Sequence, residues 1–126
     1  VPVYDKDMLA PVGAVTFVNN KWHSTCNSLC PGSPDEWYHE RELKYPHIVH
    51  AEENLIARLG ALLWGEIVAV THFPCQPCAK LLSAARVGQV IALRQEDYET
   101  RWADSVRGAQ DIFNRAGIPY RVYERK

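Results

Sequence analysis

The chain has 126 residues, of which 47% are apolar and 23% are charged, and its formal net charge is −1. This composition is typical of a globular protein and excludes an intrinsically disordered one. The length lies within the usual range for one domain, so we expect a single domain over residues 1–126. A chain without a basic excess is a poor partner for a nucleic-acid backbone, so we expect no polynucleotide partner. A small phosphorylated ligand is not excluded, because one phosphate needs only a few donors.

The apolar runs, such as residues 61–64, are much shorter than the roughly 20 residues that span a bilayer, and no charged-then-apolar leader opens the chain. We therefore expect no membrane partner.

Two of the four cysteines lie in a C-x-x-C motif, which favours a metal role and a reducing cytoplasmic location over disulfides. Cys26 and Cys30, with His23 or His39, could form a second metal site, although free thiols are often simply small apolar side chains.

The N-terminal third predicts a hairpin followed by a loop. Residues 12–18 are apolar and β-branched, and Asn19 and Asn20 offer turn chemistry before a second extended run over residues 21–26. The segment from residue 27 to residue 46 is rich in proline, which interrupts regular structure. We interpret it as a loop that could cover a site.

The rest of the chain alternates predicted helices and strands. A first helix is predicted from His50 to Leu63, a strand over residues 67–71, and a second helix just after Pro74. A strand over residues 87–93 precedes a third helix over residues 99–116. The predicted buried stripe of that helix is Trp102, Val106, Ala109, Ile112 and Phe113.

Gly117 is expected to end this third helix, and residues 120–123 form the last predicted strand. The order is therefore two strands and then three helix–strand units. This order predicts an α/β domain in which helices flank a mixed sheet.

Three residues have the chemistry of a zinc site. His50, Cys75 and Cys78 supply one imidazole and two thiolates, which leave the fourth tetrahedral position open for water, as in catalytic zinc sites. The cysteines are three residues apart at a predicted helix start, so they share one face. The positive end of the helix also lowers the pKa of a thiol.

Glu52 completes the motif as a carboxylate that is not counted among the ligands. Zinc lowers the pKa of a bound water to about 7, and a nearby carboxylate can collect the proton and pass it to a departing amine. The pattern H-x-E followed by P-C-x-x-C is the known signature of zinc-dependent nucleobase deaminases. The alternative is a structural zinc knot. Glu53 points about 100° away along the helix and is expected to be solvated.

The sequence around these motifs resembles the deoxycytidylate (dCMP) deaminase family. Residues 44–54, K-Y-P-H-I-V-H-A-E-E-N, resemble its K-Y-P lead-in and H-A-E-x-N core, and residues 73–82, F-P-C-Q-P-C-A-K-L-L, resemble its second box. Residues 12–15 are similar to its first strand, and Asn27 falls at the position of its loop asparagine.

The resemblance implies a cytidine deaminase-like, three-layer α/β/α fold with a mixed sheet of about five strands. It implies conversion of dCMP to dUMP with release of ammonia, with Zn²⁺ as cofactor, and a homo-oligomer. His50, Cys75 and Cys78 would hold zinc, and Glu52 would shuttle protons.

The resemblance also suggests substrate contacts. Asn27 resembles the residue that contacts the sugar, and an amide can both donate to and accept from a hydroxyl. The backbone N–H of Ala51 or of Cys75 could hold the ring carbonyl, because helix N-termini present free donors. Tyr98 could border the pyrimidine pocket. The alternatives are a turn role for Asn27 and core packing for Tyr98.

The chain departs from the family pattern beside Asn27. Thr25-Cys26 replaces a glycine-tyrosine pair, and Ser28 replaces a glycine. These positions help to form an effector-binding loop in regulated family members, so we expect no allosteric control by deoxynucleoside triphosphates. On charge alone, the candidates for a phosphate contact are Lys21, Arg41 and Lys44.

Other functions remain open at this point. A free nucleoside, a 5-substituted dCMP or a tRNA adenosine could be the substrate. Outside enzymes, the chain could be a catalytically silent deaminase fold that uses zinc to stabilise a binding surface. Replacement of Glu52 separates these two classes, because only an enzyme would lose turnover.

Overall fold

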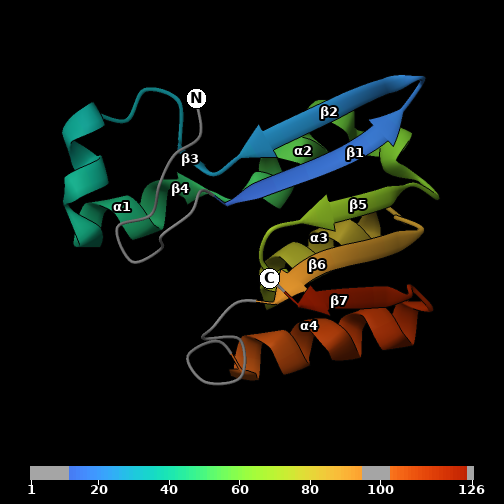
Figure 1. Ribbon diagram of the computed structural model, residues 1–126. Helices are drawn as coiled ribbons and strands as arrows, with labels where there is room; N and C mark the ends of the chain where they lie inside the picture. The colour runs from blue at the N-terminus through green and yellow to red at the C-terminus, as the bar shows by residue number, and fades with distance from the viewer. Residues whose placement is uncertain (1–11, 95–102, 125–126) are drawn as a thin grey trace.

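The computed structural model describes residues 12–94 and 103–124 (Figure 1). The strands are β1 (Gly13–Val18), β2 (Lys21–Cys26), β3 (Ser28–Leu29), β4 (Ile48–Val49), β5 (Ile67–Val70), β6 (Gln89–Arg94) and β7 (Tyr120–Glu124). The helices are η1 (Asp35–His39), α1 (Arg41–His47), α2 (Ala51–Leu59), η2 (Gly60–Leu63), α3 (Gln76–Ala84) and α4 (Ala103–Ala116), where η marks a 3₁₀ helix.

Five strands form one mixed sheet in the order β2-β1-β5-β6-β7. β1 is antiparallel to both β2 and β5, whereas β5, β6 and β7 run parallel to one another. The predicted hairpin is confirmed, since Val18 pairs with Lys21 across the Asn19–Asn20 turn, where both asparagines have positive φ. The predicted mixed five-stranded α/β sheet is therefore confirmed.

The prediction of a loop between residues 27 and 46 is wrong. This segment holds β3, η1 and nearly all of α1, which includes Pro46. β3 pairs with β4 in a separate two-stranded sheet, where Ser28 lies opposite Val49. The proline-rich composition misled the prediction, because pairing with a distant strand is not visible in the local sequence.

Two predicted helices have different bounds in the structure. α2 ends at Leu59, because Gly60 adopts a φ of 49°, and the chain continues as the 3₁₀ turn η2 to Leu63. α4 is described from Ala103 onward, so the predicted start at residue 99 and Trp102 lie outside the described residues. Gly117, with a φ of 71°, follows the end of α4 as expected.

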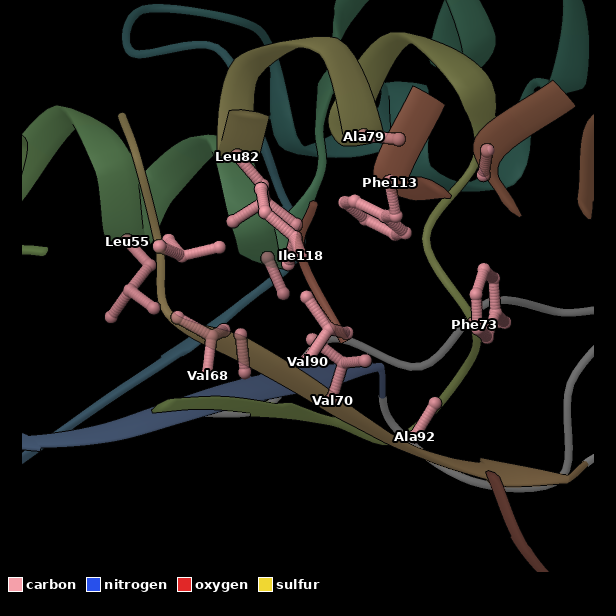
Figure 2. Close-up of a cluster of buried hydrophobic side chains, with 14 of the residues drawn as sticks. Leu55, Val68, Val70, Phe73, Ala79, Leu82, Val90, Ala92, Phe113 and Ile118 are labelled. Carbon is pink, nitrogen blue, oxygen red and sulfur yellow. The ribbon is translucent and has the colours of Figure 1, made fainter. Parts of the chain in front are cut away.

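The core lies between the sheet and a layer of helices formed by α2, α3 and α4 (Figure 1). Figure 2 shows Val68, Val70 and Val90 of the sheet facing Leu82 of α3 and Phe113 of α4. Strand residues alternate between the two faces of a sheet, so these residues share one face with the helices. Burial of these side chains is the main force that holds α3 and α4 against the sheet.

The opposite face of the sheet is open at its β2–β1–β5 end. Phe17 and Ile67 each adjoin a buried strand residue, and Phe17, Trp22 and Ile67 are 45%, 69% and 50% exposed. The rings of Phe17 and Trp22 lie 4.9 Å apart across the hairpin. None of the helices in the described part of the chain has the length and apolar character that a membrane crossing needs.

Candidate metal and catalytic site

The first part of the site is the N-terminus of α2. His50 is the N-cap residue, with extended backbone angles, and its carbonyl oxygen accepts a hydrogen bond from the N–H of Asn54 at 3.0 Å. Its own N–H donates to Oε1 of Glu53 at 2.9 Å, as in a capping box. The expectation that Glu53 is simply solvated is therefore wrong.

The second part is the N-terminus of α3. Cys75 is the N-cap residue there, and Pro77 occupies the first turn, where proline costs no hydrogen bond. Cys78 lies in the same turn and is fully buried. The predicted placement of the C-x-x-C motif at a helix start is thus observed.

Packing of α2 beside α3 brings the three predicted ligands together. Nδ1 of His50 lies 3.1 Å from Sγ of Cys78 and 3.4 Å from Sγ of Cys75. The three ligand atoms all lie within 4.8 Å of one another. Tetrahedral zinc with ordinary bond lengths would separate a nitrogen and a sulfur ligand by about 3.6 Å and two sulfurs by about 3.8 Å. The donor set and its spacing therefore fit zinc.

The thiols of the site have opposite pKa shifts. A hydrogen bond from the Cys78 thiol, with a further contribution from His50, lowers the pKa of Cys75 to about 4. The same thiol–thiol hydrogen bond and burial raise the pKa of Cys78. The hydrogen bond to Cys75 raises the pKa of His50 to about 9. Cys75 is therefore the member of the cysteine pair that is a thiolate before a metal binds, and thiolates are the form that metals bind.

Glu52 is the only buried carboxylate in the described residues, at 5% exposed. It is not part of the group formed by the possible ligands His50, Cys75 and Cys78. Burial raises its pKa to about 7, against the opposing effect of His50. A carboxyl group with such a pKa can both accept and return a proton near neutral pH.

The segment that carries Asn27 lies against α2. The hydroxyl of Thr25 donates to the carbonyl oxygen of Ala51 at 2.6 Å. Nδ2 of Asn54 donates to the carbonyl oxygen of Cys26 at 2.8 Å and to Oγ of Ser28 at 3.1 Å. Asn27 itself is 6% exposed, and its N–H donates to the carbonyl oxygen of Val12. The sequence did not predict the hydrogen bonds that Thr25, Ser28 and Asn54 make. The only sign of them was that Thr25 and Ser28 differ from the family pattern beside Asn27.

The other candidates have mixed outcomes. Ala51 is the first residue of α2 and is fully buried, so its N–H belongs to the helix end, where donors lack partners within the helix. Tyr98 lies outside the described residues. Within residues 12–94 and 103–124, the second metal site suggested for Cys26 and Cys30 is not formed.

Two phosphate candidates can be placed. Lys21 pairs with Val18 at the turn of the hairpin, whereas Asn27 follows the other end of β2. The six residue steps from Lys21 to Asn27 span about 20 Å of extended chain, so Lys21 lies too far away to share a small substrate with Asn27. Lys44 is 5% exposed within α1.

Comparison with known families identifies the class of protein to which this fold and ligand set belong. Residues 3–94 match the family model for the cytidine and deoxycytidylate deaminase zinc-binding region. The chain belongs to this family.

Known relatives support the same assignment. The chain is 36% identical over 118 residues to an uncharacterized deaminase in the luxG 3′ region of Aliivibrio fischeri, covering 91% of this chain and 80% of that protein. It is 32% identical over 83 residues to human deoxycytidylate deaminase. That match covers 65% of this chain but only 45% of the human protein, so the chain spans less than half of its length.

Solved structures show the same fold. A dCMP deaminase from the cyanophage S-TIM5, solved in complex with dCMP and dUMP, matches with a TM-score of 0.66 at 20% identity, over 94% of this chain and 83% of that one. RibD from Acinetobacter baumannii matches with a TM-score of 0.60 at 21% identity, over 90% of this chain and 29% of that one. At these identities the likeness establishes the fold.

Proposed function

We propose that this protein binds zinc through His50, Cys75 and Cys78 and hydrolyses dCMP to dUMP and ammonia. The observation that carries the proposal is the buried Glu52 beside a His/Cys/Cys ligand set that leaves one tetrahedral position open. Human deoxycytidylate deaminase as a relative and the cyanophage enzyme solved with dCMP and dUMP support this choice of substrate.

Zinc, when bound, would activate a water molecule for hydrolysis at neutral pH. Glu52 then accepts one proton of that water and delivers a proton to the exocyclic amine at C4 of cytosine. The water oxygen becomes the new C4 carbonyl oxygen, the second water proton ends on ring N3, the bond between C4 and the amine nitrogen breaks, and ammonia leaves. A pKa of about 7 suits both the acceptance and the return of the proton.

The rest of the pocket would orient the base and sugar. The N–H groups of Ala51 and Cys75, at the starts of α2 and α3, would donate to the ring carbonyl. Asn27 would hydrogen-bond to the deoxyribose hydroxyl, because its amide can donate and accept. Tyr98 would border the pyrimidine.

We further propose that the protein is a homo-oligomer, because Trp22 and Trp64 are 69% and 68% exposed. Light scattering would measure the mass of the protein in solution.

The test is to incubate zinc-loaded protein separately with dCMP, deoxycytidine and dCTP and to resolve the products by chromatography. We expect dUMP from dCMP, and a loss of at least about a hundredfold in turnover for Glu52→Gln with zinc content unchanged. Glu53→Gln, which keeps the capping acceptor, is the matched control and should stay active. Zinc binding without turnover of any of the three compounds would support a binding module instead.

A further inference from the structure

The segment on either side of Asn27 is tied to α2 by side-chain hydrogen bonds. Thr25 bonds to the carbonyl oxygen of Ala51 at 2.6 Å, in a buried position. Asn54 bonds to the carbonyl oxygen of Cys26 at 2.8 Å and to the hydroxyl of Ser28 at 3.1 Å. We call Thr25, Ser28 and Asn54 the clasp.

The clasp holds a junction between two sheets. β2 ends at Cys26 in the five-stranded sheet, and β3 begins at Ser28 in the two-stranded sheet, so Asn27 is the single residue between them. Asn27 belongs to neither strand, although Cys26 pairs with Gly13, Ser28 pairs with Val49, and the N–H of Asn27 donates to the carbonyl oxygen of Val12. The clasp supplies contacts at the positions immediately before and after it.

The other ends of these hydrogen bonds lie in the first turn of α2. Ala51 precedes Glu52 directly, and Asn54 follows it by two residues. The clasp therefore connects the residues beside Asn27 to the residues beside Glu52. Thr25 and Ser28 stand where the family pattern described above has glycines, so their side-chain contacts belong to this chain, whereas Asn54 is the asparagine of the H-A-E-x-N core.

We propose that Thr25, Ser28 and Asn54 are positioning residues that fix Asn27 against the first turn of α2 and thereby set recognition of the sugar hydroxyl. This proposal rests on the proposed function. The clasp groups act through Asn27 and take no part in proton transfer. Their loss should therefore raise KM for dCMP and leave kcat nearly unchanged.

The test compares Thr25→Val, which keeps the shape and removes the hydroxyl, with Thr25→Ser, which keeps the hydroxyl. Ser28→Ala is a second variant, at a less buried position, in case Thr25→Val impairs folding. The control is Arg58→Ala, which removes another contact between α2 and β2, an exposed hydrogen bond to the carbonyl oxygen of Ser24 that does not involve Cys26, Asn27 or Ser28.

Two substrates separate a positioning role from a general loss of structure. dCMP carries a 3′-hydroxyl, whereas 2′,3′-dideoxycytidine 5′-monophosphate offers none to Asn27. The wild type should prefer dCMP in kcat/KM. We expect Thr25→Val and Ser28→Ala to raise KM for dCMP about three- to tenfold and to reduce this preference by the same factor. Thr25→Ser and Arg58→Ala should retain it.

The outcomes are distinguishable. If the wild type is active and both Thr25→Val and Ser28→Ala keep its preference for dCMP, the positioning role of the clasp is refuted. The proposed function would still stand. An equal fall in kcat/KM for both substrates would also overturn it, because the effect would then not involve the sugar hydroxyl. A zinc-loaded wild type that deaminates neither compound would overturn the proposed function and the clasp's substrate role together.

Discussion

Oε1 of Glu53 accepts a hydrogen bond from the backbone N–H of His50 at 2.9 Å. This contact satisfies a backbone donor at the start of α2 and fixes the backbone from which the imidazole extends. Glu53 is the residue after the proposed catalytic Glu52, so two adjacent carboxylates have different tasks.

The contact predicts that Glu53 supports metal binding indirectly. Glu53→Ala should weaken zinc affinity about tenfold, as loss of groups that orient metal ligands does. Glu53→Gln should bind zinc like the wild type, because its amide oxygen can accept the same hydrogen bond. Competition with a chromophoric chelator measures both affinities. Equal affinities for the alanine and glutamine variants would show that the cap does not orient His50.

Removal of zinc should destabilise the fold, because the metal would join α2 to α3 through His50 and the cysteine pair. With zinc at about a hundred times its Kd, chelation should lower Tm by about 5–10 °C. Cys78→Ala should abolish this chelator-dependent shift, whereas Cys30→Ala, outside the ligand group, should retain it. A chelator shift that survives in Cys78→Ala would place the metal elsewhere.

Burial of Glu52 should reduce stability as the pH rises. Its pKa is raised from 4.5 to about 7 in the folded protein, so between these values the unfolded state loses the proton and the folded state keeps it. Unfolding is therefore favoured as the pH rises through this window, by up to about 3 kcal/mol above pH 7.

Glu52→Gln removes this titration. In the metal-free protein, the free energy of unfolding of the glutamine variant relative to the wild type should grow by about 2 kcal/mol between pH 5.5 and 7.5. Urea titrations at several pH values measure the difference, and the other titrating groups are common to both proteins. Parallel pH curves would show that Glu52 has an ordinary pKa in the folded state.

Two glycines should respond differently to alanine. A Cβ at Gly88 would overlap the backbone of Gly65, which cannot move because its N–H bonds to the carbonyl oxygen of Arg86. A Cβ at Gly108 would lie 2.7 Å from Oε1 of Gln76, the end of an exposed, flexible side chain.

Gly88→Ala should therefore cost about 1–3 kcal/mol of unfolding free energy. Gly108→Ala should be near neutral or stabilising, because alanine favours the interior of α4 by up to about 1 kcal/mol. Denaturant unfolding of the two variants measures the difference. A larger cost for Gly108→Ala than for Gly88→Ala would contradict this packing.

Much of the domain follows from local patterns. The turn residues Asn19 and Asn20 predicted the hairpin, and the spacing of Cys75 and Cys78 predicted that both lie at the start of one helix. These features depend on residues close together in the chain. Their geometry within one element is therefore set by helix and strand periodicity alone.

The contacts between elements could not be predicted from local sequence patterns. Pairing of Ser28 with Val49, the hydrogen bonds of Asn54 to the segment around Asn27, and the 3.1 Å approach of His50 to Cys78 all join distant parts of the chain. The sequence by itself determined which residues have the chemistry of a deaminase. Only the tertiary structure decided how they meet, because those distances depend on how α2 and α3 pack together over the shared core of the sheet.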